Sequence, residues 1–344
     1  MPSILSIGTS LPKFSYSLSD VEEVGRNWLK GNEVQLQQFL RFTKSSKVQS
    51  RRFAVPKEEI LNLGGLEKRA AIFEETGATI GEASIKEAAA NLKRDPSEID
   101  CLVFTSCSCP TIPSIDGEII NRLGLDRNLT RVPIFQYGCA GGVAGLSLAS
   151  KLTESHKLVC LNSVELCSLV FQPQNSSSAQ LVGSAIFADG SASVLLSKEE
   201  KGLTIRASRS YLIPNSRGLM GYFLLDDGFH LLLDKSLPQK LVKVAPKVIE
   251  SFLKDNSVSD VDYWLFHPGG VKILDFLENS LKIPHEKCRW AREILNSVGN
   301  MSSATVLFVL KKFLEESNLK RGEKVVLLGI GPGLTIELIL FEWV

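Results

Sequence analysis

The chain has 344 residues, of which 44% are hydrophobic and 22% charged, a composition that supports a sizeable core and excludes wholesale disorder. Its 39 Lys and Arg residues against 38 Asp and Glu residues leave a formal charge of +1, so no global basic field exists for nucleic acid or an anionic membrane. The apolar runs are far shorter than the roughly 20 residues of a membrane helix, and the first residues lack the pattern of a signal peptide. We therefore expect a cytoplasmic protein that binds neither nucleic acid nor membrane.

The cysteines and histidines do not form a metal-binding or disulfide pattern. Seven cysteines is an odd number, and a chain of this length does not need disulfides for stability. Zinc usually takes paired C-x-x-C or His-rich spacing, which the four scattered histidines do not provide. We expect no metal and a reducing compartment in which most cysteines are small buried side chains.

Strand-like and helix-like segments alternate along the chain, which indicates an α/β fold. A helix is predicted over 80–92, with Thr76 or Thr79 as its N-cap, and 172–179 is the most loop-like stretch. Buried strands are predicted at 100–105, 158–161, 191–196, 263–266 and 324–328, and further helices at 241–252 and 306–316.

Two parts of the chain resemble each other at an offset of 162 residues. Ile99–Phe104 (IDCLVF) matches Val261–Phe266 (VDYWLF), and each strand is followed by a Pro-containing loop and an amphipathic helix, at 115–125 and at 271–283. At the same offset Gly138 matches Asn300, each at the start of a helix rich in small residues. The sequence predicts two duplicated α/β halves, 1–200 and 201–344.

Cys139 lies in the most informative segment, FQYGCAGGVAGLSLAS (135–150). A short extended run ends at Gly138, and a Gly- and Ala-rich helix follows the cysteine. The N-terminus of a helix stabilises negative charge and lowers a thiol pKa. Small residues also let a backbone N–H approach the oxygen of a bound thioester. The alternative is that the glycines serve helix packing and Cys139 is an uninvolved buried side chain.

His267 and Asn300 are the candidate partners of this thiol. His267 follows a strand end in WLFHPGG, where ligands bind in α/β sheets, and Asn300 begins a helix in SVGNMSS. Alone, each has an ordinary explanation, a structural histidine and an N-cap. If the halves are duplicated, Cys139 on one half faces His267 and Asn300 on the other, giving a nucleophile, a base and a neutral amide donor.

The motifs GCAGG, HPGG, GNMSSA and GIGPGLTIE, in this order over essentially the whole chain, resemble the type III polyketide synthases, the chalcone-synthase-like family of thiolase-fold enzymes. The resemblance implies a five-layer αβαβα fold and a homodimer. It implies that Cys139 carries the acyl group, that His267 holds it as a thiolate by ion pairing, and that His267 and Asn300 stabilise the enolate from malonyl-CoA decarboxylation. Loss of carbon dioxide drives the Claisen condensation, so no metal or redox cofactor is implied.

The resemblance also implies substrate-binding positions. Phe187 and Phe229 match the two phenylalanines between the CoA tunnel and the cavity, and Cys167 and Val170 replace threonines of plant chalcone synthases, which makes the cavity less polar. Ile112 approximates the residue that crosses the dimer interface. The remaining expected contacts are Thr105, Gly221, Gly269, Gly270 and Ser302.

A basic stretch from Arg26 to Lys57, with eight basic residues and one acidic residue, fits the phosphates of CoA better than DNA, and Arg41, Lys44 and Lys47 are its candidate contacts. The apolar cavity positions favour a fatty acyl-CoA starter and a pyrone or resorcinol-type product. Three alternatives remain: a ketoacyl synthase III-type enzyme acting with acyl carrier protein, a catalytically inactive thiolase-fold binding protein, and a nucleotide-binding protein using 329–333, which lacks the lysine of a phosphate loop.

Overall fold

The structure, a computed structural model, describes residues 1–344 and contains one large sheet and two small ones. The strands are β1 (Ser3–Ser10), β2 (Phe14–Ser17), β3 (Ser50–Phe53), β4 (Cys101–Ser106), β5 (Thr130–Phe135), β6 (Val159–Leu166), β7 (Asp189–Ser197), β8 (Leu203–Leu212), β9 (Met220–Leu225), β10 (Gly228–Leu233), β11 (Tyr263–Phe266), β12 (Lys324–Gly331) and β13 (Thr335–Trp343). The helices are α1 (Leu18–Trp28), α2 (Glu33–Ser46), α3 (Leu66–Ile72), α4 (Ala78–Asn91), α5 (Asp116–Leu123), α6 (Gly141–Leu152), α7 (Ser178–Ile186), α8 (Leu237–Asp255), α9 (Val271–Leu281), α10 (Trp290–Val298) and α11 (Thr305–Glu316).

The large sheet consists of two similar halves. Its strand order is β11-β12-β13-β8-β1-β7-β6-β4-β5, and a single residue pair, Ser3 with Thr204, joins β1 to β8. Within the first half β1 and β6 pair antiparallel with β7, and β4 pairs parallel with β6; within the second half β8 and β12 pair antiparallel with β13, and β11 pairs parallel with β12. The predicted match of β4 with β11 and the predicted duplicated α/β fold are therefore confirmed.

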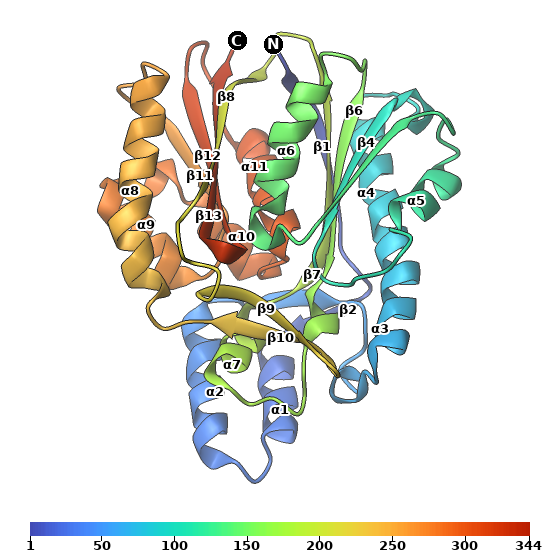
Figure 1. Ribbon diagram of the computed structural model, residues 1–344, viewed down its shortest axis with the longest axis vertical. Helices are drawn as coiled ribbons and strands as arrows, with labels where there is room; N and C mark the ends of the chain where they lie inside the picture. The colour runs from blue at the N-terminus through green and yellow to red at the C-terminus, as the bar shows by residue number, and fades with distance from the viewer.

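Helices and sheet halves stack in five layers, which Figure 1 shows side by side. The helices α4 and α5 cover the outer face of the first half, and α8 and α9 lie outside the second. Between the halves lie α6 and α11, each of which contacts strands of both. Small residues at the start of α6 allow this middle layer to pack closely, because a Cβ on Gly142 would lie 2.2 Å from the carbonyl oxygen of Ser303. No helix combines the length and the apolar composition that crossing a bilayer requires.

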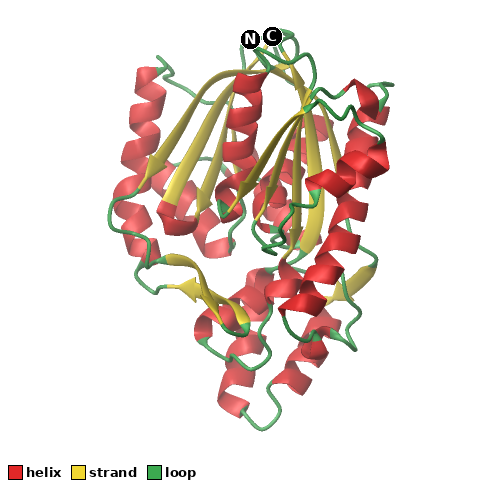
Figure 2. Cartoon of the chain, turned by 45° about the vertical axis from the view of Figure 1, so that its right-hand side comes forward, coloured by secondary structure: helices red, strands yellow, loops and turns green.

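Below the ends of the sheet lies a cap formed by α1, α2, α7 and the β9–β10 hairpin (Figures 1 and 2). Ser17 begins α1 with a capping box, in which its hydroxyl accepts from the Asp20 N–H and the Asp20 carboxylate accepts from the Ser17 N–H. The cap packs around an aromatic group that includes Trp28 and Phe39, whose ring centroids lie 5.8 Å apart. The cap matters for function because it holds the pocket described below.

Two boundary predictions were wrong. The helix predicted from residue 80 is preceded directly by a π-helical turn over 73–77 and by α3, so neither Thr76 nor Thr79 is an N-cap. The Thr79 hydroxyl instead donates to the Glu75 carbonyl oxygen one turn earlier, as a residue inside a helix does. The loop predicted over 172–179 ends early, because the Ser177 side chain caps α7.

Candidate active site

The turn between β5 and α6 places Cys139 where the two halves meet. Gly138 has φ +52°, and a Cβ there would lie 2.4 Å from Pro332, so this position requires glycine. Cys139 follows in a short 3₁₀ turn over Gly138–Ala140, and its side chain is half-buried. The Ala140 backbone packs against β12, where a Cβ on Gly331 would lie 2.9 Å from the Ala140 nitrogen.

Asn300 reaches the same place through Ser302. The Ser302 hydroxyl lies 3.6 Å from the Cys139 sulfur, and the Ser302 N–H donates to Asn300 Oδ1 at 2.9 Å. The Thr305 hydroxyl also donates to Oδ1, at 3.4 Å, so the amide oxygen of Asn300 is engaged and its NH₂ group is left to donate elsewhere. A free amide donor beside a thiol is the arrangement that oxyanion stabilisation requires.

His267 lies at the end of β11, and its backbone N–H donates to the Leu328 carbonyl oxygen of β12 at 2.8 Å. His267 therefore lies beside the C-terminal end of β12, the part of the strand against which the Cys139 turn packs. The ring is 4% exposed, and neither ring nitrogen has a hydrogen-bond partner. A buried histidine with two unpaired nitrogens is available to a substrate, since such groups are normally satisfied within the protein.

No hydrogen bond joins His267 to Cys139 in this structure, and the thiolate–imidazolium pair stays a prediction. Burial raises the pKa of the Cys139 thiol to about 11 and lowers the pKa of His267 to about 3. The Ser302 hydroxyl opposes the shift at Cys139, but burial is the larger cause. Both shifts have the same cause, since removal from water disfavours the charged form of each group.

A buried carboxylate, Glu165, which the sequence did not predict, accepts hydrogen bonds from segments that border the Cys139 site. Glu165, at the end of β6, is fully buried and accepts from the Cys107 N–H at 3.0 Å and from the Ser108 hydroxyl at 2.8 Å. The Ser303 hydroxyl also donates to Glu165. Burial raises the pKa of Glu165, and these donors oppose that shift. One signal was available, a lone carboxylate within the apolar run VCLNSVEL.

Cys107 is a second thiol of the site. Its sulfur lies 3.3 Å from the Ser302 hydroxyl, so both Cys107 and Cys139 contact Ser302. Thr105, predicted to contact substrate, lies within β4, and its hydroxyl would be 2.7 Å from a Cβ on Gly141, two residues after Cys139. Its contact with substrate stays a prediction.

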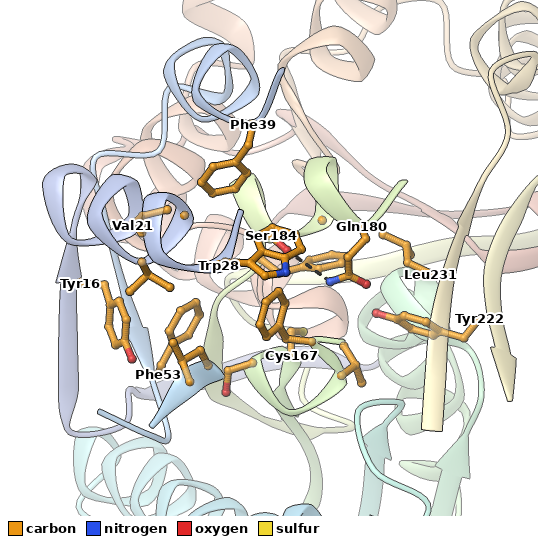
Figure 3. A pocket seen from close by; sticks show the side chains of 18 residues that line it. Tyr16, Val21, Trp28, Phe39, Phe53, Cys167, Gln180, Ser184, Tyr222 and Leu231 are labelled. Carbon is orange, nitrogen blue, oxygen red and sulfur yellow. Dashed lines mark hydrogen bonds between the residues drawn. The ribbon is translucent and has the colours of Figure 1, made fainter. Parts of the chain in front are cut away.

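An apolar pocket lies in the cap (Figure 3), and one of its lining residues, Phe187, forms an isolated β-bridge with Asn300. Cys139, His267 and Asn300 do not themselves line it. Thirteen of its 18 lining residues are hydrophobic, and Cys167, Val170 and Phe187, all predicted for substrate, are among them. Tyr222, which the sequence did not predict, extends into it from β9, with Val21 of α1 on the opposite side. Burial and the nearby Cys167, Cys107 and Cys139 raise the Tyr222 pKa well above its usual value, so its phenol is neutral and close to the thiols.

Phe229 and Gly221 lie beside this pocket and are not among its lining residues. The Phe229 ring packs against Tyr222, with centroids 5.7 Å apart. Gly221 precedes Tyr222 and pairs with Leu232 across the hairpin, so the neighbouring tyrosine presents its side chain to the pocket. Their predicted contacts with substrate stay predictions.

The glycines after His267 form the turn into α9. The Gly269 N–H donates to the His267 carbonyl oxygen at 2.9 Å, and Gly270 has φ +153° at the N-cap of α9. A Cβ on Gly270 would meet no atom within 4 Å, so the surface in front of this turn is open.

The candidate CoA contacts Arg41, Lys44 and Lys47 are exposed on α2 and at its left-handed C-cap. None of the three forms an ion pair with an acidic side chain, unlike Lys57, which binds Asp20. Phe39 of the same helix lines the apolar pocket, so these cations lie on the element that borders it. Ile112 is 97% exposed.

The cysteine turn lies between two duplicated half-sheets, and the second half contributes a histidine and an asparagine. This arrangement defines a condensing enzyme of the thiolase type. Comparison with known proteins gives the family. The models of the chalcone and stilbene synthases match residues 1–199 with the N-terminal domain and residues 204–344 with the C-terminal domain. The chain belongs to this family and is a type III polyketide synthase, an acyltransferase that performs Claisen condensation.

Several bacterial relatives are similar over most of their length. The chain is 32% identical to the 1,3,6,8-tetrahydroxynaphthalene synthase of Streptomyces griseus, over 88% of this chain and 83% of that protein. It is 30% identical to the phloroglucinol synthase of Pseudomonas fluorescens, over 88% of each. The crystal structure of the tetrahydroxynaphthalene synthase of Streptomyces coelicolor superposes with a TM-score of 0.94 at 29% identity, covering 99% of both chains. Family membership replaces the ketoacyl synthase III and nucleotide-binding alternatives.

Proposed function

We propose that this enzyme loads a fatty acyl-CoA starter onto Cys139 and extends it with malonyl-CoA, giving a pyrone or resorcinol-type product. The proposal is supported by the apolar pocket that Cys167 lines. Figure 3 shows Val21 and Tyr222 on opposite sides of it, with Trp28 and Cys167 between them, and Val24 also lines it. Hydrocarbon lining favours an alkyl chain over a polar one, at roughly 0.8 kcal/mol for each buried CH₂ group.

Loading would use Cys139 as the nucleophile and His267 as the base. As the Cys139 sulfur attacks the thioester carbonyl, a ring nitrogen of His267, which has no other hydrogen-bond partner, would accept the thiol proton. The new thioester forms as the bond to CoA breaks, and the CoA thiolate takes up the proton from His267. The site then contains an acyl-enzyme and a neutral imidazole.

Extension would use the free amide of Asn300. Malonyl-CoA loses carbon dioxide, and the charge left on the thioester oxygen is stabilised by Asn300 NH₂ and by an N–H of His267. The enolate carbon attacks the acyl thioester, forming the new carbon–carbon bond and releasing the Cys139 sulfur. We propose no metal or redox cofactor for this step, since release of carbon dioxide supplies its driving force.

Substrate delivery and assembly complete the proposal. The unpaired cations Arg41, Lys44 and Lys47 would bind the CoA phosphates beside the pocket. We also propose a homodimer, because Ile112 at 97% exposure and the exposed Phe135 are large apolar side chains that monomeric proteins tend to cover. A cytoplasmic location is supported by seven cysteines that are all free thiols.

Starter preference tests the proposal. Purified enzyme is assayed with malonyl-CoA and a panel of hexanoyl-, octanoyl-, palmitoyl- and coumaroyl-CoA, and the products are identified by mass spectrometry. Octanoyl- to palmitoyl-CoA should give the highest kcat/KM. Val24→Trp should lower kcat/KM for palmitoyl-CoA while sparing hexanoyl-CoA, because Val24 lines the pocket. The control Val242→Trp, at a position 50% exposed on α8, should change neither. Preference for coumaroyl-CoA would refute the fatty acyl proposal.

A further inference from the structure

A cluster of three different metal-ligand side chains lies at the turn between α9 and α10, and the condensing site does not use it. The cluster contains Glu278 from α9, His285 from a short 3₁₀ turn, and Cys288, which follows that turn. One donor atom from each lies within 4.8 Å of the other two. The closest measured pair is His285 Nδ1 and Glu278 Oε2, 3.6 Å apart.

The local backbone brings these side chains together. Helix α9 ends at Lys282, whose left-handed conformation (φ 52°) reverses the chain direction. Pro284 then starts the 3₁₀ turn that carries His285, three residues before Cys288. The Cys288 side chain is buried, and its hydrogen bonds to the backbone carbonyl oxygens of His285 and Pro284 are long, at 3.6 and 3.7 Å. The thiol therefore has no strong partner to lose on binding an ion.

The carboxylate is already oriented for an ion. Arg292 Nε donates to Glu278 Oε1 at 2.8 Å, and the other side of the same guanidinium donates to Asp275 at 2.7 Å. This leaves Glu278 Oε2 facing His285. Carboxylate ligands of metals are commonly held in this way by a second hydrogen-bonding partner. The His285 side chain is 62% exposed, so solvent has access from its side.

We propose that Glu278, His285 and Cys288 bind one zinc ion, with water as the fourth ligand. Thiolate, imidazole and carboxylate are the side chains that tetrahedral zinc takes, and the soft thiolate disfavours magnesium and calcium. Bonds of roughly 2.0–2.3 Å place neighbouring donor atoms about 3.3–3.8 Å apart, so the existing cluster needs only a small contraction. On binding, the Cys288 thiol loses its proton to solvent and a sulfur–zinc bond forms.

The ion would fasten the end of α9 to the segment that begins α10. Helix α9 starts at the His267-Pro-Gly-Gly turn, so zinc would stabilise the element that follows the catalytic histidine without entering the reaction. The sequence predicted no metal here because it lacks paired C-x-x-C spacing; the ligands instead combine an H-x-x-C turn with a carboxylate seven residues earlier.

Zinc binding is tested with the full chain carrying Cys139→Ala, which removes the catalytic thiol as a competing ligand. Titration of zinc against a chromophoric chelator should give one equivalent per chain and a higher Tm. Cys288→Ser or His285→Ala should weaken binding at least about 100-fold, and Arg292→Met roughly 10-fold, the range for a second-sphere change. The control His156→Ala, outside the cluster, should bind zinc unchanged.

Cobalt(II) gives a readout that does not depend on the stability of the variants. Added to the Cys139→Ala protein, it should produce a thiolate-to-cobalt charge-transfer band that zinc removes. Absence of this band, or zinc binding that persists in folded Cys288→Ser and His285→Ala proteins, would overturn the proposal.

Discussion

The close packing of α6 against the Asn300 segment can be tested with one added methyl group. A Cβ on Gly142 would lie 2.2 Å from the Ser303 carbonyl oxygen and 2.9 Å from Val306, whereas ordinary contact begins at 3.4 Å. Gly142→Ala must therefore separate the two backbones by more than about 1 Å. Ser303 directly follows Ser302, so this movement lengthens the 3.6 Å contact between Ser302 and the Cys139 sulfur.

The expected cost is larger for catalysis than for folding. Overpacking of this kind destabilises a protein by about 1–3 kcal/mol, whereas a misplacement of about 1 Å in a reacting geometry can cost about 100-fold in rate. Single-turnover acylation by acyl-CoA and release of carbon dioxide from malonyl-CoA measure the two catalytic steps, and thermal unfolding measures stability. We expect a folded Gly142→Ala protein with condensation reduced about 100-fold.

Gly145→Ala, on the same helix, is the matched control. Its Cβ would lie 2.7 Å from a terminal methyl carbon of Leu161, which can rotate away because it ends a flexible side chain. This variant should keep condensation within a few-fold of the parent enzyme. If Gly142→Ala retains full activity, or if both variants lose activity equally, the geometric argument is wrong.

Three further predictions concern single groups. Burial raises the pKa of Cys139 to about 11 and lowers the pKa of His267 to about 3. Iodoacetamide should therefore alkylate Cys139 in the free enzyme faster as the pH rises from 7 to 10. An alkylation rate that already reaches its plateau below pH 7 would show a thiolate–imidazolium pair instead. Asn300→Ala should raise the barrier to malonyl-CoA decarboxylation by roughly 2–4 kcal/mol and affect loading less; equal losses would contradict its role as an oxyanion donor. Arg51 is fully buried and donates hydrogen bonds to the carbonyl oxygens of Ser184, Ala185 and Phe187. Arg51→Met should therefore lower the free energy of unfolding by about 3–5 kcal/mol, and Arg51→Lys should lower it by less. Urea denaturation measures both changes.

The sequence predicted β4, β6, β7, β11 and β12 of the large sheet, because these strands are short buried runs, but it did not predict β1, β8 or β13. The match of 99–104 with 261–266 correctly identified β4 and β11 as equivalent strands, since each occupies the corresponding place in its own half-sheet. The cap was not predicted. Helix α1 carries local signals that could have predicted it, a capping box at Ser17 and an amphipathic pattern, whereas the packing of the cap around the pocket depends on long-range contacts.

Site residues that belong to short sequence motifs were predicted. Site residues whose position depends on long-range packing or strand register were not. The contacts joining Cys139 to Asn300 follow the predicted motifs, with Ser302 between them. Cys107 and Tyr222 were not predicted, because Cys107 enters the site through a long-range contact with Ser302 and because the hairpin register decides which β9 side chain enters the pocket. Neither can be obtained from residue types alone.

The most direct test of the account is the acyl-enzyme itself. The enzyme is incubated with acyl-CoA in the absence of malonyl-CoA, and intact mass spectrometry followed by peptide mapping locates the adduct. We predict one acyl group per chain, on Cys139, which malonyl-CoA discharges into product and which Cys139→Ala abolishes. An unmodified protein, as an inactive binding protein would give, or an acyl group that resides on another residue and persists in Cys139→Ala, would contradict the assignment of Cys139 as the nucleophile.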